Sequence, residues 1–382
     1  KNNMKIGFYS QNYNTLGKYW EKLRNKADCW WGVSEKKLYN LLKNKKIKNI
    51  SYHLEKYIKN SKSKKGNNYI STDPISAQKL IVKEIDPDVW VVDTPNKLKY
   101  YSEKSFRVQT FHALPLKKAV FFKPYLNYDL ILLPGQFHKN EFVKRFNLKK
   151  NDARFKIIGW PNTDDLIKKK YNRKKIMNKL NLDPMKKTVM YAPTWGWGNG
   201  NDTLFARWFD KEEEVFKKIC KKIFNKNLNF IVRLHTLSFC ANKKKLINIA
   251  ENYNVLWQTN AVSNFRDNPN EYLWITDILI SDLSGIITEF MVLDRPIIYI
   301  NPNENLNLWK NSDMPKSFRA GHVIEEPDQL LEAIDDSILI PKRFSKQRKD
   351  LLSKIYFKLD GNATNRGVEA IMNFAVHKKI KF

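Results

Sequence analysis

The sequence has few cysteines and no long apolar run. Its three cysteines, Cys29, Cys220 and Cys240, show no C-x-x-C spacing, which excludes a zinc ribbon and a disulfide framework and fits a reducing compartment. No run of about 18 apolar residues occurs and no charged-then-apolar leader opens the sequence, so we expect neither a membrane-spanning helix nor a secretion signal. These absences predict a cytoplasmic protein.

Acidic residues are scarce as well. The chain has 39 Asp and Glu against 69 Lys and Arg, a formal net charge of +30. Such a surplus attracts anions: nucleic acid, acidic lipid headgroups or a polyphosphate substrate. The alternative is an AT-rich genome, which favours Lys, Asn and Ile and would leave much of the surplus as solvated lysine.

Glycine and proline are also too few for a disordered or collagen-like chain. With 13 Gly, 15 Pro and 42% hydrophobic residues in 382 positions, the chain should fold into about two domains of roughly 150 residues each. Short apolar runs alternate with amphipathic segments, which predicts an α/β fold with parallel sheets covered on both faces. We expect strands at residues 5–9, 89–93, 107–111, 129–133, 156–159, 188–192, 229–234, 255–258, 278–281 and 296–300, and helices at 35–45, 74–84, 137–145, 211–224, 242–253, 285–293 and 328–334.

A very basic stretch interrupts this alternation near residues 164–183. We place the domain boundary in it, with Rossmann-like domains at residues 1–165 and 166–358. A C-terminal helix at 359–382 is expected to pack back toward the first domain. Two doubly wound domains facing a cleft form the GT-B architecture, and ligands of such sheets bind beyond the carboxyl ends of the strands. Functional residues should therefore follow strands.

The first two candidate motifs follow expected strands in the two halves of the chain. In T-F-H-A-L-P-L-K-K (110–118), His112 ends a strand and a proline turn follows, which would put a neutral base next to phosphate-binding lysines. A histidine satisfied in the core is the alternative. In Y-A-P-T-W-G-W-G-N-G (191–200), the glycines let backbone approach a ligand and the tryptophans can stack on one, but the G-x-G-x-G spacing is not a Rossmann fingerprint.

The third motif, R-L-H-T (233–236), ends a strand in the second half. Alternation along a strand puts Arg233 and His235 on the same side, a geometry suited to holding a diphosphate.

The fourth motif, S-D-L-S-G-I-I-T-E (281–289), turns from a strand into a helix. The N–H groups at Ser284 and Gly285 would form an anion site. Glu289, one helical turn later, could accept hydrogen bonds from ribose hydroxyls. The alternative is an ordinary Asp or Ser N-cap followed by a surface glutamate.

Taken in order, these motifs resemble the CDP-glycerol glycerophosphotransferase family, the teichoic-acid and capsule polymerases of the TagF and TagB type. The family pattern reads W-H-G-x-P-L-K, Y-A-P-T-W, R-x-H-P and T-D-Y-S-S, with an acidic residue in the next helix. Residues 157–164 (I-I-G-W-P-N-T-D) are similar to its G-x-P-R-x-D junction, and residues 360–366 (D-G-N-A-T-N-R) to its D-G-x-A-x-x-R segment. The resemblance covers about residues 89–368.

The sequence departs from that pattern at several places, which leaves the identity of the donor open. Ala113 follows the histidine in place of glycine, Thr236 replaces the proline, and Gly196 stands where an arginine is usual. Leu283 and Gly285 replace the tyrosine and the second serine.

The resemblance implies transfer of a polyol phosphate, glycerol phosphate above all, from a CDP-linked donor to a hydroxyl of a teichoic-acid-like or capsular polymer, with release of CMP. It makes residues 1–165 the acceptor side and 166–358 the donor side. The implied catalytic residues are His112, the general base, and His235, which with Arg233 would neutralise the donor diphosphate. The other implied contacts are Ser284 and Gly285 to the diphosphate, Glu289 to the ribose, Thr194 and Trp195 to the nucleotide, Asp282 as an orienting residue, and Lys117 and Arg366 to phosphate or acceptor.

No cofactor and no metal are required by this scheme. The D-x-D at residues 86–88 precedes a strand instead of following one, and the sequence has no P-loop. The expected partners are the CDP-activated polyol, an anionic polymer or lipid-linked acceptor, and an anionic membrane touched peripherally at the inner face of the bacterial cytoplasmic membrane. We expect residues 168–175 and 62–65 to make that contact.

Two alternatives from other classes remain. A GT-B glycosyltransferase acting on a nucleotide-diphosphate sugar would share the fold, the anion site and the ribose-binding glutamate. A non-enzymatic nucleic-acid binder is suggested by the +30 charge alone, and it predicts aromatic residues interleaved with basic ones on exposed strands. Most aromatic residues here lie in apolar strand runs, so we expect no nucleic acid as a partner.

Overall fold

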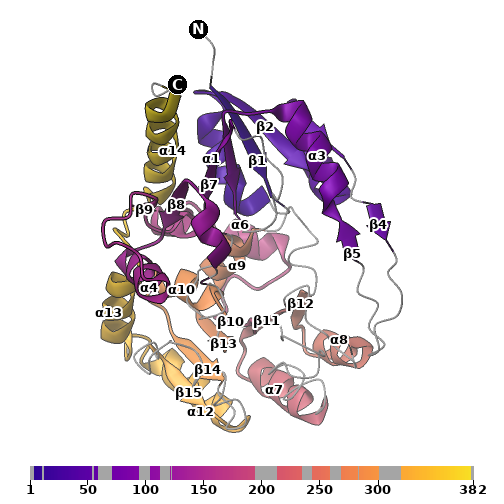
Figure 1. Ribbon diagram of the computed structural model, residues 1–382. Helices are drawn as coiled ribbons and strands as arrows, with labels where there is room; N and C mark the ends of the chain where they lie inside the picture. The colour runs from indigo at the N-terminus through magenta and orange to yellow at the C-terminus, as the bar shows by residue number, and fades with distance from the viewer. Residues whose placement is uncertain are drawn as a thin grey trace, which may run out of the picture. The chain divides into compact units, whose positions relative to one another are not determined.

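Figure 1 shows the computed structural model, which describes residues 4–10, 13–53, 56–58, 71–93, 104–111, 121, 123–193, 213–234, 243–258, 268–282, 284–300 and 320–379. The contacts divide the chain into two compact units. Unit 1 holds the described residues of 1–114, 121–161 and 362–382, and unit 2 holds those of 162–361. The sequence places the first boundary at residues 165/166, and the contacts place it at 161/162.

Unit 1 is built on a parallel sheet whose strands, among the described residues, run in the order β3-β2-β1-β6-β7-β8-β9. Strands are added outward from β1 in both directions, so the sheet is doubly wound and its topological switch point lies between β1 and β6. The strands are β1 (Lys5–Tyr9), β2 (Asp28–Val33), β3 (Ile50–Tyr52), β6 (Val89–Val92), β7 (Phe106–Gln109), β8 (Leu130–Leu133) and β9 (Phe155–Ile157).

The helices of unit 1 come from both ends of the chain. The last of them, α14 (Ala363–Lys379), packs against α1 (Tyr13–Leu23). Gly367 makes this approach possible, because a Cβ there would lie 2.5 Å from Cε1 of Tyr19. The remaining elements are α2 (Lys36–Asn44), α3 (Pro74–Ile85), α4 (Gln136–Phe146), the 3-10 helix η2 (Lys123–Asn127), and the antiparallel hairpin of β4 (Lys56–Ile58) and β5 (Ser71–Asp73).

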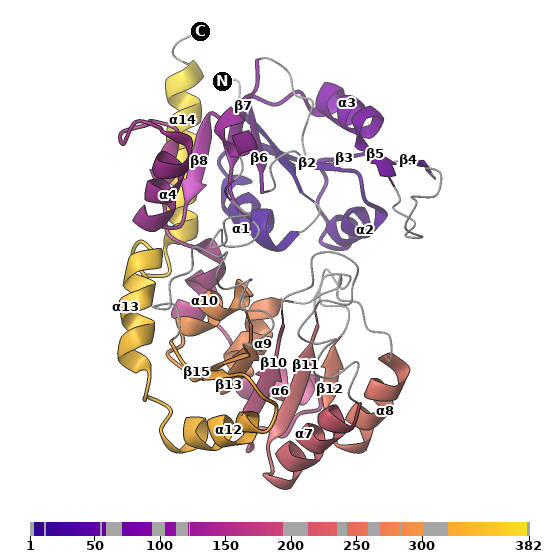
Figure 2. The same ribbon diagram turned by 60° about the horizontal axis from the view of Figure 1, so that its bottom comes forward.

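Unit 2 repeats the design. In its described part the strand order is β12-β11-β10-β13-β14-β15, parallel throughout, with the switch point between β10 and β13. Figure 2 shows α7 and α8 side by side next to β11 and β12. The strands are β10 (Thr188–Tyr191), β11 (Asn229–Arg233), β12 (Leu256–Gln258), β13 (Ile278–Ser281), β14 (Ile297–Ile300) and β15 (His322–Ile324).

The helices of unit 2 pack on its sheet and on one another. They are α5 (Asp164–Ile167), α6 (Arg173–Lys179), α7 (Glu213–Asn225), α8 (Lys243–Asn252), α9 (Pro269–Ile275), α10 (Ile286–Met291), α12 (Gln329–Leu339) and α13 (Ser345–Ile355). The 3-10 helix η3 (Pro161–Thr163) spans the boundary between the units. Within the described residues, no helix combines the length and apolar character needed to cross a membrane.

The central strands of unit 2 confine its polar groups to the strand ends. Every residue of β10, β11, β13 and β14 is buried, and helices α7 and α12 supply core side chains such as Phe216 and Ile334. Because both faces of such a sheet are covered, a ligand can reach polar groups only beyond the strands. The expected α/β class, two doubly wound parallel sheets, is confirmed.

Candidate functional site

Three of the sequence motifs start at neighbouring points of one sheet edge in unit 2. Strand β10 pairs with β11 on one side, where Tyr191 lies opposite Val232, and with β13 on the other, where it lies opposite Ile280. At the end of β13, the buried Ser281 hydroxyl donates a 2.6 Å hydrogen bond to the carbonyl of Ala192. The segments that follow these three strands therefore begin side by side at the switch point, where doubly wound sheets bind ligands.

Arg233 is the last residue of β11 and is 6% exposed. Its guanidinium lies 4.3 Å above the ring of Tyr272 on α9. A cation–π contact of this kind attracts the guanidinium to the ring. Tyr272 therefore helps to hold the Arg233 side chain at the end of β11.

The turn after β13 carries Asp282, Ser284 and Gly285. Asp282 is buried, and its charge adds to burial in raising the pKa of the Tyr191 phenol far above its usual value. Ser284 and Gly285 are half-buried. Thr288 Oγ1 donates a 2.9 Å bond to the Gly285 carbonyl, which fixes the first turn of α10. Because α10 has six residues, local N–H groups matter more here than a helix dipole.

Glu289 lies in α10, half-buried, and contacts two distant segments of unit 2. Its Oε1 accepts a 3.0 Å hydrogen bond from Nδ2 of Asn162. On the other side lies Tyr356, just past α13, whose pKa is raised well above normal first by burial and then by the charge of Glu289. The carboxylate is therefore held beside the turn of the fourth motif.

The structure thus gathers five of the predicted site residues on unit 2. These are Arg233, Asp282, Ser284, Gly285 and Glu289. Five others lie outside the described residues: His112, Lys117, Thr194, Trp195 and His235. Arg366 lies on α14 of unit 1, where its Nε donates a 2.7 Å bond to the carbonyl of Ile158 and ties that helix to the chain just past β9.

Sequence reasoning missed two side-chain hydrogen bonds. One is the contact from Asn162 to Glu289, which joins residues 127 positions apart. The other is a buried hydrogen bond of 2.7 Å from Oγ of Ser10 to Oδ2 of Asp93 at the switch point of unit 1. The sequence did carry a signal for Asp93, because this carboxylate closes the apolar run of β6.

No metal centre is evident in the part of the chain that the structure describes. In that part, no group of three or more His, Cys, Asp or Glu side chains is arranged to hold an ion.

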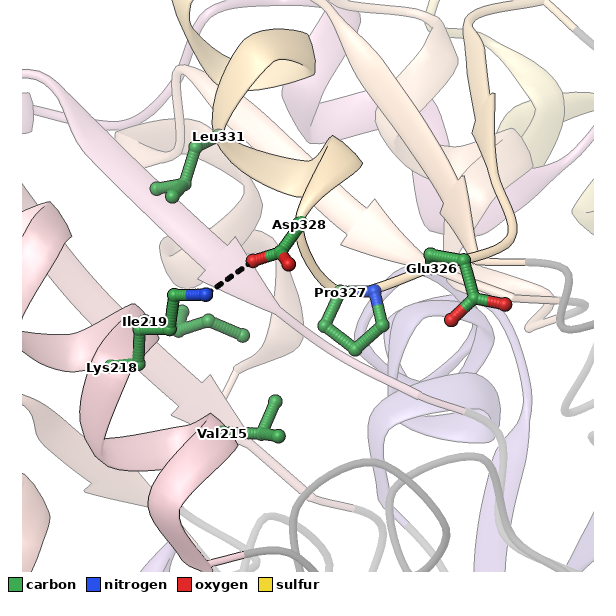
Figure 3. Close-up of a pocket in the computed structure, with 7 residues that line it drawn as sticks. All are labelled: Val215, Lys218, Ile219, Glu326, Pro327, Asp328 and Leu331. Atoms are coloured by element: carbon green, nitrogen blue, oxygen red, sulfur yellow. Dashed lines mark hydrogen bonds and ion pairs between the residues drawn. The ribbon is translucent and has the colours of Figure 1, made fainter.

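A cavity of about 350 Å³ lies in unit 2 between α7 and the start of α12 (Figure 3). Lys218 pairs with Asp328 across it at 2.5 Å, and this hydrogen bond lowers the pKa of the aspartate. Its lining consists of Val215, Lys218, Ile219, Glu326, Pro327, Asp328 and Leu331. None of the motif residues lines it, so it is not the candidate site.

The fold of this chain is similar to that of solved structures. The wall teichoic acid polymerase TagF superposes with a TM-score of 0.68 at 17% identity, over 98% of this chain and 89% of that one. A UDP-GlcNAc 2-epimerase from Neisseria meningitidis, bound to UDP-GlcNAc, superposes with a TM-score of 0.63 at 15% identity, over 97% of this chain and 100% of that one. At these identities the likeness establishes the fold alone, and it agrees with the GT-B-like expectation.

Curated relatives are enzymes of teichoic acid synthesis. A teichoic acid poly(glycerol phosphate) polymerase of Bacillus spizizenii is 28% identical over 221 residues, 51% of each chain. The ribitol-phosphate polymerase TarL of Staphylococcus aureus is 30% identical over 51% of this chain and 33% of its own length. The teichoic acid glycerol-phosphate transferase of Staphylococcus aureus is 24% identical over 74% of this chain and 75% of its own.

The chain matches about half the length of the first of these relatives and a third of the second. A family model, by contrast, matches residues 6–373, nearly the whole chain. The chain belongs to the CDP-glycerol:poly(glycerophosphate) glycerophosphotransferase family.

Proposed function

We propose that the chain transfers a polyol phosphate from a CDP-linked donor to a hydroxyl of a teichoic-acid-like or capsular polymer and releases CMP. The observation that carries this proposal is that β11, which ends at Arg233, and β13, which leads into the turn of Ser284 and Gly285, both flank β10 in unit 2, and that Glu289 lies on the helix after that turn. Cationic, amide and carboxylate groups in that order match the diphosphate and ribose of a nucleotide. Family membership and relatives that act on glycerol and ribitol phosphates support it.

Donor binding in this proposal divides among the groups of unit 2. Arg233 and His235 offset the charge of the diphosphate, and the Ser284 hydroxyl and Gly285 N–H donate hydrogen bonds to it. Glu289 accepts from the ribose hydroxyls, while Thr194 and Trp195 contact the nucleotide. Phosphoryl transfer depends mainly on positioning and charge stabilisation, so these residues carry much of the catalysis, and no cofactor or metal enters the scheme.

The transfer itself needs one proton acceptor. The acceptor hydroxyl oxygen attacks the phosphorus that bears the polyol, a new P–O bond forms, and the bond from that phosphorus to the bridging oxygen of CMP breaks. His112 takes the proton of the hydroxyl, a step that contributes on the order of 10²–10⁴-fold in rate. Lys117 and Arg366 are the remaining candidates for phosphate or acceptor contacts.

The donor can be glycerol- or ribitol-linked, and we propose glycerol first. The second candidate function, transfer of a sugar from a nucleotide diphosphate, is favoured by one observation: an epimerase bound to UDP-GlcNAc shares the fold. A TagF structure soaked with CDPG shares it too, with a TM-score of 0.68.

A donor screen tests the proposal. The protein is incubated with a teichoic-acid acceptor oligomer and CDP-glycerol, CDP-ribitol or a panel of UDP-sugars, and the released nucleotide is quantified. We expect CMP from a CDP-polyol and elongation of the acceptor by one polyol phosphate. Release of UDP from a sugar donor, with no CMP, would transfer the assignment to glycosyl transfer.

The same proposal includes peripheral contact with an anionic membrane at the inner face of the cytoplasmic membrane. Of the basic stretch 168–175, Arg173 donates a 2.7 Å bond to Asp277 and Lys170 pairs with Asp165 at 2.8 Å. Lys169, Lys174 and Lys175 are exposed, and we assign the contact to them. Residues 62–65 lie outside the described residues.

A further inference from the structure

Asn162 has no role in the proposed function so far. It contacts Glu289, the residue proposed to bind the ribose. Asn162 is the first described residue of unit 2 and lies in the 3-10 helix η3. Its Nδ2 stands 3.0 Å from Oε1 of Glu289, and both side chains are half-buried. The hydrogen bond reaches across 127 positions, so it belongs to the tertiary structure of unit 2.

The backbone of Asn162 is itself held in place. Asn270 on α9, 4% exposed, donates a 2.7 Å bond from Nδ2 to the carbonyl of Asn162. The N–H of Asn270 in turn donates to Oδ1 of Asn268, the N-cap of α9, and Nδ2 of Asn268 donates to the hydroxyl of Tyr171. This connected set ties η3 to the start of α9, and a fixed backbone gives the Asn162 amide a defined direction.

The amide suits a carboxylate that must still bind a ligand. One N–H bond uses one of roughly four acceptor positions on a carboxylate, so Oε1 can accept further hydrogen bonds. An amide is also neutral. An arginine, which the junction pattern similar to residues 157–164 has at this place, would offset the negative charge of Glu289. With Asn162 the carboxylate keeps that charge, and hydrogen bonds to a charged acceptor are roughly twice as strong as neutral ones.

We propose that Asn162 is the positioning residue that aims Glu289 at the ribose hydroxyls and so sets the preference for ribonucleotides over deoxyribonucleotides. This inference rests on the proposed function, because it takes Glu289 as the ribose ligand. Asn162 acts through the carboxylate and touches no nucleotide itself.

The test compares the affinities of the full chain for CMP and 2′-deoxycytidine monophosphate by calorimetry. The native chain should prefer CMP, and Glu289→Ala should abolish the preference. Asn162→Ala should lower it at least about fivefold and leave the affinity for the deoxynucleotide within about twofold. In a double-mutant cycle, adding Asn162→Ala to Glu289→Ala should change the preference no further.

Two more variants separate positioning from folding. Asn162→Asp keeps the shape of the side chain and its backbone bond to Asn270, but sets an acceptor oxygen against the carboxylate, so it should lower the preference more than Asn162→Ala does. It decides the question if Asn162→Ala fails to fold. Asn178→Ala, an exposed amide on α6 of the same unit, is the matched control and should keep the native ratio.

The outcomes distinguish this inference from the proposed function. If Glu289→Ala loses the preference and both Asn162 variants keep it, the positioning role is wrong while the ribose site stands. Equal weakening of both nucleotides by the Asn162 variants would show a general structural role and also overturn the inference. If Glu289→Ala itself keeps the preference for CMP, both the assignment of Glu289 to the ribose and this inference are wrong. The donor screen then still tests the proposed polyol-phosphate transfer independently.

Discussion

The two switch points share a strand order and differ in what lies at them. In unit 1, the ends of β1 and β6 are joined by the bond between Ser10 and Asp93, which are 5% and 2% exposed. In unit 2, the ends of β10 and β13 are joined by the buried Ser281, and the chain continues into the half-buried turn of Ser284 and Gly285. The first switch point has a bond between two buried polar side chains, and the second is followed by polar groups that are only half-buried.

The difference shows that the strand order provides a position where a ligand can bind, and that the side chains at that position decide whether one does. A buried carboxylate is tolerated when it accepts hydrogen bonds. In unit 1 the bond to Asp93 joins the ends of two strands. At the second switch point a serine hydroxyl and a backbone carbonyl join the two strands, so no carboxylate is used for that purpose. The proposed function accordingly has the nucleotide on unit 2.

The largest expected effect separates catalysis from binding. His112→Ala should lower kcat at least about 100-fold and leave donor affinity intact, because a general base acts in the transition state. His235→Ala should weaken donor binding and slow turnover together, since the diphosphate is charged in both states. Single-turnover kinetics with calorimetric donor affinities make the comparison. Near-native turnover of the His112 variant would remove it from the mechanism.

A crossed pair of serines tests the two switch points directly. Ser10→Ala should lower the free energy of unfolding by about 1.5–3 kcal/mol, the cost of a lost hydrogen bond to a buried charge, and leave CDP affinity unchanged. Ser284→Ala should do the opposite, weakening CDP with a stability change within about 0.5 kcal/mol. Urea unfolding and calorimetry provide both numbers. If both variants change the free energy of unfolding and the CDP affinity in the same way, the contrast between the two switch points is wrong.

Acid should affect unit 1 through His138 on α4. Burial lowers the pKa of this side chain from 6.5 to about 3. The unfolded chain therefore binds a proton first, so the contribution of neutral His138 is complete above about pH 6.5 and declines as the pH falls toward 3. Between pH 7 and pH 5 the loss is about 2 kcal/mol.

His138→Leu should remove that part of the pH dependence. Urea unfolding of the native chain and the variant at both pH values measures it. An acid-induced loss of stability equally large in the two proteins would place the acid sensitivity in other groups.

The smallest effect on turnover concerns the surface charge. Changing Lys169, Lys174 and Lys175 to Glu should abolish binding to anionic vesicles, which salt should also weaken by screening over about 8–10 Å. Transfer to a short soluble acceptor should stay within about twofold. The matched control changes the exposed Lys221, Lys222 and Lys244, which alters the net charge equally. Equal loss in both triple variants would favour the genome-composition explanation of the +30.

Sequence reasoning located the strand ends well where buried apolar runs are long enough. Residues 5–9 and 278–281 coincide with β1 and β13, and Arg233 and Glu289 lie on the elements expected for them. These predictions succeed because a parallel strand that is buried on both faces needs a continuous apolar run, which can be recognised in the local sequence.

The sequence failed where distant residues determine the local structure. Strand β2, D-C-W-W-G-V, has an Asp and a Gly, which weaken its strand signal. Gly32 is needed there because a Cβ would lie 2.5 Å from Ile81 on α3. The three-residue β15 follows Gly321, whose Cβ would overlap the carbonyl of Ile297. The sequence likewise could not predict that Asn162 is the hydrogen-bond partner of Glu289, since no residue near either position indicates the other.

The packing of α14 on α1 has a consequence for synthesis on the ribosome. The two helices belong to the same unit, yet about 200 residues of unit 2 are translated between residues 161 and 362. At roughly 5–20 residues per second this takes about 10–40 s. The surface of α1 around Tyr19 therefore stays uncovered for that time, until Gly367 has been synthesised. Unit 2 can finish folding first. Translation speed and chaperones that hold a nascent chain therefore act on unit 1 more than on unit 2.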